Sequence, residues 1–213
     1  MRRYLASGAD GVEVDVYVEN GRPRIGHPPR RGRPRLLRAR LARKLESLHL
    51  TPGLDPRRLG SLLGPGRILW LDLKDRGAPR ILGALAASLP RGMELVVSTR
   101  YHDEAPGARA ALPGALVMLS IESRPPKLRP LLEAAGADGV TVEASYIDEG
   151  LVGEAREMGA RLAAWVVNEP EEMERLIRLG VDYLITDYPE VAVRVRERLC
   201  GGVGHWHAPG RLL

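Results

Sequence analysis

The sequence predicts an α/β fold whose parallel sheet closes in the manner of a (β/α) barrel. Short apolar, β-branched segments alternate with amphipathic segments of helical period, and such alternation implies parallel strands joined by helices. Acidic and polar residues stand at the ends of several of these strands, where barrels of this type place their active sites. An open, doubly wound sheet is the structural alternative.

The elements follow in a nearly regular order along the chain. Strands are expected at 11–18, 68–74, 94–98, 115–121, 139–143, 161–167 and 182–186. Helical patterns fall between them at 79–89, 103–111, 127–136, 148–158, 170–179 and 189–199. Pro170 followed by two acids indicates a helix start, and Gly159 and Gly180 stand where helices should stop.

The strand count is one short of a closed barrel, which needs eight. Residues 2–11 have the pattern of a last helical turn with a glycine stop. The pattern therefore lacks a first strand and most of a first helix. A barrel with that gap leaves two strand edges unpaired, so we expect either oligomerisation across the gap or its occupation by residues 201–213.

Glu13 and Asp15 are the clearest functional signal in the sequence. They lie two residues apart in a valine-rich strand, so both carboxylates point to one face of the sheet. Like charges at the end of a buried strand need a compensating cation, and a hard divalent metal with oxygen ligands is the usual solution. A surface-facing pair on an edge strand is the alternative; His27 and the later Asp72–Lys74 pair favour the metal.

Composition indicates a single-domain protein of ordinary size. We expect one barrel domain over residues 1–200 and a C-terminal tail at 201–213. Phe and Gln are absent and Arg far outnumbers Lys, a bias of G+C-rich or thermophilic sources. The single cysteine, Cys200, excludes an internal disulfide. With no membrane-length apolar run and no signal peptide, a cytoplasmic location is expected.

The net charge of +5 arises from one segment. Residues 22–44 hold ten Arg and Lys residues and no acid, so the rest of the chain carries −5. This basic segment fits an electropositive mouth for a phosphate-bearing substrate, or a solvated arginine-rich loop and helix. It has no interleaved aromatic residues, so a nucleic-acid partner is not expected.

Three motifs together resemble the glycerophosphodiester phosphodiesterase family. The stretch GADGVEVDVYVENGRPRIGH at 8–27 is similar to that family's second strand and the hairpin leading to a histidine. ILWLDLKD at 68–75 looks like its third strand, with Asp72 where the family usually has Glu. RLAAWVVNEPEEMERLIRLGVDYLITDYP at 161–189 resembles its closing segment. The likeness runs from residue 2 to about 199 and implies a TIM-type barrel.

The resemblance also implies roles for individual residues. Glu13, Asp15 and Asp72 match the family's metal ligands, which would hold Mg²⁺ or Ca²⁺. His27 matches a general acid that protonates the leaving alcohol. Lys74 matches a residue that pairs with the phosphate, in a catalytic and substrate-binding role.

The resemblance of residues 161–189 implies further roles. Trp165 matches an aromatic wall against the glycerol, with plain core packing as the alternative. Asn168 and Asp187 are expected to order loops.

The chain also departs from the family. A first strand bearing His-Arg-Gly, which supplies the other catalytic histidine and a phosphate-binding arginine, has no counterpart before Met1. Either Met1 matches an internal position of helix 1, or the Gly/His/Pro-rich tail fills the vacant slot as a circular permutant would. A frayed tail is the simpler expectation for such a composition.

The expected activity is metal-dependent hydrolysis of a small glycerophosphodiester to glycerol 3-phosphate and an alcohol. Without the His-Arg-Gly strand, slow turnover is expected unless His205 or His207 takes the missing role. The alternative is a catalytically inactive phosphate-binding or scaffold protein of the same fold.

Overall fold

The computed structural model describes residues 6–26, 63, 65–87, 89, 91–200 and 211–213. The described strands are β1 (Gly11–Glu19), β2 (Arg22–Ile25), β3 (Ile68–Leu73), β4 (Glu94–Thr99), β5 (Leu116–Ile121), β6 (Gly139–Glu143), β7 (Arg161–Trp165), β8 (Tyr183–Leu184) and β9 (Arg211–Leu212). The described helices are α4 (Pro79–Ala86), α5 (Ala105–Ala111), α6 (Leu128–Ala135), α7 (Glu149–Glu157), α8 (Pro170–Leu179) and α9 (Pro189–Cys200), with 3₁₀ turns η1 (His102–Glu104) and η2 (Ala144–Tyr146). All seven predicted strands and all six predicted helices are present, with small shifts at their ends.

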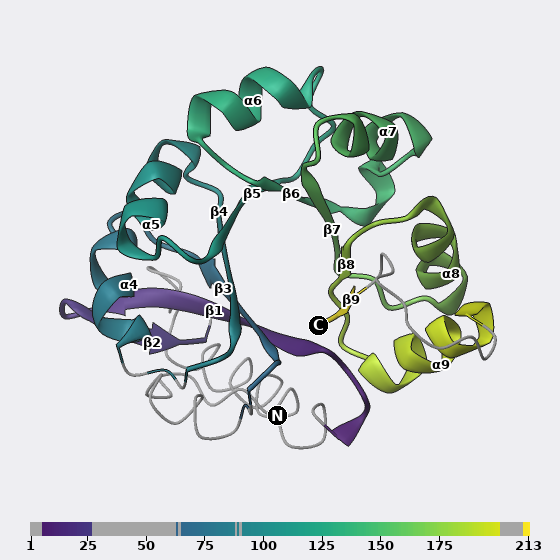
Figure 1. The fold of residues 1–213 in the computed structure, drawn as a ribbon, viewed down its shortest axis with the longest axis horizontal. Coiled ribbons are helices and arrows are strands. Elements are labelled where there is room, and N and C mark those ends of the chain that lie inside the picture. The colour runs from purple at the N-terminus through teal and green to yellow at the C-terminus, as the bar shows by residue number, and fades with distance from the viewer. Residues whose placement is uncertain (1–5, 27–62, 64, 88, 90, 201–210) are drawn as a thin grey trace, which may run out of the picture.

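The strands form one curled sheet in the order β2-β1-β3-β4-β5-β6-β7-β8-β9. Every neighbouring pair is parallel except the β1–β2 hairpin. Helices α4 to α9 follow one another around the outside of this sheet, and the strands line the inside (Figure 1). The arrangement is that of a (β/α) barrel, so the doubly wound alternative, with helices on both faces, is wrong.

Alternation along the strands divides the core into two layers. Outward-facing residues such as Val14 on β1 and Leu71 on β3 pack under the helices. The inward-facing residues Trp70, Val96, Met118 and others form a separate cluster inside the barrel. The Trp70 ring meets Tyr183 edge to face with centroids 5.3 Å apart, a favourable geometry for aromatic pairs. The interior of the barrel is therefore packed.

The C-terminal residues fill the position beside β8. Strand β9 pairs with β8 in parallel register, Tyr183 opposite Arg211 and Leu184 opposite Leu212. On its other side, the backbone amide of Asp10, the residue before β1, donates a hydrogen bond to the Leu212 carbonyl over 2.9 Å. The side chain of Leu212 is fully buried. The prediction that the gap could be occupied by residues 201–213 is confirmed for 211–213.

That closure is partial. A single backbone hydrogen bond, supported by the Asp10 carboxylate accepting from the Leu212 amide at 2.8 Å, joins β9 to β1. No ladder forms between them, so the barrel is incomplete at this seam. Oligomerisation stays a prediction.

Helix ends follow the sequence signals. Pro170 opens α8, and Gly180 ends it in the left-handed conformation at φ 92°. Gly159 follows α7 with φ 65°, another conformation that favours glycine. Both predicted glycine stops are therefore observed.

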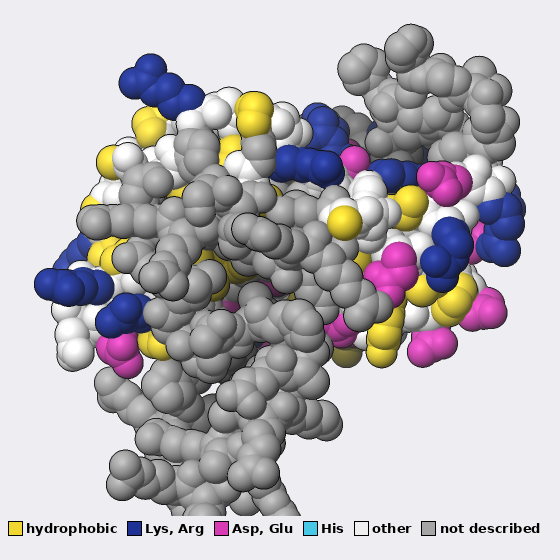
Figure 2. Space-filling model, turned by 90° about the horizontal axis from the view of Figure 1, so that it is seen from below, with side chains coloured by type: hydrophobic (Ala, Val, Ile, Leu, Met, Phe, Trp, Pro, Cys, Tyr) yellow, Lys and Arg dark blue, Asp and Glu magenta, His cyan; other side chains and the backbone are white. Residues whose placement is uncertain are grey.

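Charged side chains of the outer helices occur in mixed-sign groups. On the face seen in Figure 2, Lys and Arg lie interspersed with Asp and Glu at the right of the view. Glu174 of α8, for example, pairs with both Arg178 and Arg198.

Of the basic segment 22–44, only residues 22–26 are described, and there Arg24 pairs with Glu19 at 3.2 Å. Among the described helices, none is long and apolar enough to cross a bilayer.

Candidate functional site

Three carboxylates from two adjacent strands converge inside the barrel. Asp15 of β1 stands directly opposite Asp72 of β3, and Glu13 lies on the same face two residues earlier. Ligand oxygens of the three groups all lie within 4.8 Å of one another. The parallel register of β1 and β3 thus brings together residues almost 60 positions apart in sequence.

The ammonium of Lys74 bridges two of these carboxylates. Its Nζ lies 2.9 Å from Asp15 Oδ1 and also pairs with Asp72 Oδ2. Burial alone would lower the pKa of Lys74, but the charges of Asp72 and then Asp15 outweigh it and raise the pKa above its ordinary value. Lys74 is therefore a fixed positive charge in this structure.

The pKa of Glu13 is set mainly by burial. Burial is the main cause that raises the pKa of Glu13 well above its ordinary value, and the charges of Asp15 and Asp72 raise it further. Lys74 opposes this shift without reversing it. One ammonium does not neutralise three carboxylates, and the remaining charge favours an additional cation.

Asp72 is oriented by neutral side chains on the next strands. Ser98 of β4, directly opposite Asp72, donates to its Oδ1 at 2.7 Å, and Ser120 of β5 lies 3.5 Å from the same atom. The Trp70 indole in turn donates to the Ser98 hydroxyl at 2.8 Å. Sequence analysis missed both serines, although each stands near the carboxyl end of its strand.

The donor set fits a hard divalent cation. Mg²⁺ and Ca²⁺ prefer carboxylate oxygens, and the three groups here supply them from a rigid sheet with a hydrogen-bonded second layer. The side chains of Asp15 and Asp72 keep 23% and 16% exposure, so the site is reachable from solvent. Thiol or imidazole ligands, which would indicate zinc, are not part of this described cluster.

The structure describes only some of the other predicted site residues. His27, His205 and His207 lie outside the described residues. Trp165 ends β7, and its buried indole nitrogen has no hydrogen-bond partner among the described residues.

Asn168 and Asp187 order a loop, as the sequence indicated. The amide of Asn168 donates to Asp187 Oδ2 at 2.9 Å, and its oxygen accepts from the Asp187 backbone amide at 3.0 Å. These bonds tie the loop after β7 to the loop after β8.

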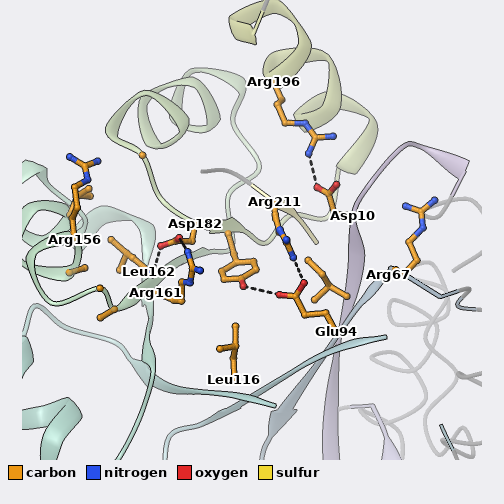
Figure 3. A pocket seen from close by; sticks show the side chains of 18 of the residues that line it. Asp10, Arg67, Glu94, Leu116, Arg156, Arg161, Leu162, Asp182, Arg196 and Arg211 are labelled. Atoms are coloured by element: carbon orange, nitrogen blue, oxygen red, sulfur yellow. Dashed lines mark hydrogen bonds and ion pairs between the residues drawn. The ribbon is translucent and has the colours of Figure 1, made fainter. Parts of the chain in front are cut away.

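A large cavity lies at the opposite end of the barrel. It has a volume of about 1010 Å³ and is lined by residues at the amino ends of the strands, including Glu94, Leu116 and Arg161 (Figure 3). Several of its charges pair with each other: Arg161 with Asp182 at 2.7 Å, and Arg211 with Glu94. Asp72 lies near the carboxyl end of β3. The cavity is at the amino ends of the strands and is therefore separate from the carboxylate cluster.

Comparison with known protein families agrees with the family resemblance of the sequence motifs. The sequence profile of the glycerophosphoryl diester phosphodiesterase family matches residues 78–191, more than half of the chain. The matched segment begins after β3, so it does not include the three carboxylates. A comparison with curated protein sequences finds no match.

Solved structures of the same architecture are numerous. A phosphodiesterase from Oleispira antarctica, in complex with the product sn-glycerol-3-phosphate, superposes with a TM-score of 0.73 at 20% identity, covering 91% of this chain and 88% of that one. A glycerophosphodiester phosphodiesterase from Parabacteroides distasonis gives a TM-score of 0.65 at 21% identity, covering 93% and 90%. At these identities the likeness establishes the barrel fold.

Proposed function

Because the chain belongs to the glycerophosphoryl diester phosphodiesterase family and is thereby a phosphoric diester hydrolase, we propose that it hydrolyses glycerophosphodiesters with a divalent cation held by Glu13, Asp15 and Asp72. The products are glycerol 3-phosphate and an alcohol. The convergence of three carboxylates and one lysine at the barrel mouth carries this proposal.

Each described residue has a part that follows from its position. Glu13, Asp15 and Asp72 would hold Mg²⁺ or Ca²⁺, and the bound ion supplies charge neutralisation and orientation of the phosphodiester. Lys74, protonated throughout the neutral range, offers a point charge to the phosphate oxygens and to the charge that develops on them. Ser98 and Ser120 hold Asp72 in the orientation this binding requires.

Proton transfer is assigned to His27 by the family resemblance. In that mechanism a neighbouring glycerol hydroxyl attacks phosphorus, and the histidine gives a proton to the departing alcohol. Trp165, whose indole N–H has no acceptor among the residues that the structure describes, would offer an apolar wall and one donor to the glycerol. The substrate is a small molecule, and a cytoplasmic location stays a prediction.

The test separates metal binding from turnover. Titration calorimetry with MgCl₂ and CaCl₂ should show binding to the unmodified protein and none to the Asp15→Asn variant. Release of glycerol 3-phosphate from glycerophosphocholine should be lost in the same variant. Asp103→Asn, an exposed carboxylate beyond β4 with 65% exposure, serves as the matched control and should change neither measurement. Turnover by Asp15→Asn at the unmodified rate would contradict the proposal.

A further inference from the structure

Five arginines of the described chain line the cavity at the amino ends of the strands. Arg156 of α7 and Arg67, which precedes β3, lie on opposite sides of the cavity in Figure 3. The other three lie between them in this view: Arg161, Arg196 and Arg211. The described carboxylates of the wall number one fewer: Asp10, Glu94, Asp182 and Glu197. A volume of about 1010 Å³ is at the upper end of the size of small-molecule sites.

Two of the wall carboxylates are already occupied as hydrogen-bond acceptors. Glu94 accepts from the Tyr183 hydroxyl at 3.2 Å through Oε1 and from Arg211 through Oε2. Asp182 accepts from Arg161 at 2.7 Å through Oδ1 and from a backbone amide at 2.9 Å through Oδ2. A guanidinium has five N–H donors and no acceptor, and toward the described residues Arg161 and Arg211 each donate through one nitrogen. The wall therefore suits a ligand that is rich in acceptors.

Arg67 and Arg156 form no ion pair with a described carboxylate. Arg67 Nη1 donates to the Ala9 carbonyl, and Arg156 Nη2 donates to the Leu179 carbonyl at 3.4 Å, a long and therefore weak hydrogen bond. A carbonyl carries no net charge, so these contacts leave both guanidinium charges uncompensated. Because the two arginines lie on opposite sides of the cavity, a ligand that matches both has negative groups at both of its ends.

We propose that this cavity binds an extended polyphosphate chain, at a site distinct from the carboxylate cluster. Phosphate oxygens match the planar guanidinium fork with two parallel hydrogen bonds. Arg67 and Arg156 bind the two ends of the chain. The remaining donors of Arg161 and Arg211 bind phosphates between those ends. The aromatic residue of the described lining, Tyr183, is buried, so it offers no ring on which a nucleic-acid base could stack.

Titration calorimetry with linear inorganic polyphosphate tests the proposal. The protein is first stripped of divalent cations with EDTA and desalted, because the arginines supply the positive charge and binding needs no metal. A size-fractionated chain long enough to cross the cavity should bind at least about tenfold more tightly than tripolyphosphate, which cannot contact both end arginines together. The Arg67→Gln/Arg156→Gln double variant should bind the longer chain at least about tenfold more weakly than the unmodified protein does.

Matched variants separate the cavity from net charge. Arg80→Gln/Arg129→Gln removes two exposed arginines from α4 and α6, outside the cavity lining, and should change the affinity by less than about twofold at roughly 0.15 M NaCl. Arg156→Gln alone, at an exposed position of α7, should show part of the loss even if the double variant does not fold.

Four results would each overturn the proposal. The unmodified protein might bind neither chain, or it could bind tripolyphosphate as tightly as the longer chain. The cavity variants could retain full affinity, which would place the anion elsewhere on the protein. The control variant could lose as much affinity as the cavity variants, which would assign the binding to net charge.

Discussion

Lys74 is the internal counter-ion of the carboxylate cluster, and its replacement by Met should expose that role. At 2.9 Å from Asp15, with an effective dielectric constant of about 20, one such pair is worth about 6 kcal/mol before desolvation is counted. Side-chain exposures of 18% for Lys74 and 23% for Asp15 mean that solvent screens the pair only weakly. Removal of one partner from a fully buried pair costs about 3–5 kcal/mol, so Lys74→Met, which breaks a partly buried pair, should lose up to that much free energy of unfolding without metal.

A divalent cation should reverse much of this loss. In the unmodified protein the ion competes with the Lys74 ammonium for Asp15 and Asp72, whereas in the variant it meets no competitor. Metal at about 100 times Kd stabilises the unmodified protein by roughly 2.7 kcal/mol, and at the same concentration it should stabilise the tighter-binding variant more. Lys74→Met should therefore bind Mg²⁺ at least about tenfold more tightly, while losing activity because the phosphate loses its point charge.

Urea denaturation with and without MgCl₂, together with titration calorimetry, measures both quantities. Lys127→Met, an exposed lysine before α6, is the control and should change the free energy of unfolding by less than about 0.5 kcal/mol. Unchanged stability and unchanged or weaker metal binding in Lys74→Met would refute the reasoning.

Three further predictions follow from particular residues. The raised pKa of Glu13 means that the metal-free protein loses stability as pH rises above the ordinary glutamate value, so Glu13→Gln should flatten urea-melt stability between pH 4 and 8 while preventing metal binding by calorimetry. Leu212→Ala should lower the free energy of unfolding by about 2–5 kcal/mol, measured by urea denaturation, because this side chain is fully buried at the seam; a loss under 1 kcal/mol would contradict the described closure. Gly83→Ala, in open space on α4, should raise the melting temperature with a gain of about 0.5–1 kcal/mol, whereas Gly139→Ala should lower it, since an added Cβ would lie 2.0 Å from the Arg161 carbonyl oxygen.

The barrel was predictable because its strands and helices carry strong local signals. The valine-rich segment around Glu13 and Asp15 has the residue types of a buried strand, and Pro170 and Gly180 bound α8 with backbone preferences of their own. The meeting of Asp15 with Asp72 follows once both segments are parallel neighbours, since register then fixes which side chains share a face.

Other features depend on contacts that no local pattern encodes. Strand β9 is two residues long and has no periodicity, and its place is set by open backbone groups on β8 and β1. Lys74 pairs with Asp15 and Asp72, a contact that the sequence did not indicate, and its contact with a phosphate stays a prediction. The role of Ser98 also emerges only when β4 is placed beside β3. The catalytic parts of His27 and the tail histidines stay predictions.

The seam between β9 and β1 has a consequence for the order of folding. Asp10 and Leu212 are separated by 202 residues, so their contact closes almost the whole chain into a loop and is among the slowest to form. Until residues 211–213 pair with β8, that edge of the sheet has open backbone groups, a state that invites association. A contact that forms after the rate-limiting step of folding affects the unfolding rate more than the folding rate. Weakening the contacts of residues 211–213 should therefore accelerate unfolding and leave the refolding rate nearly unchanged.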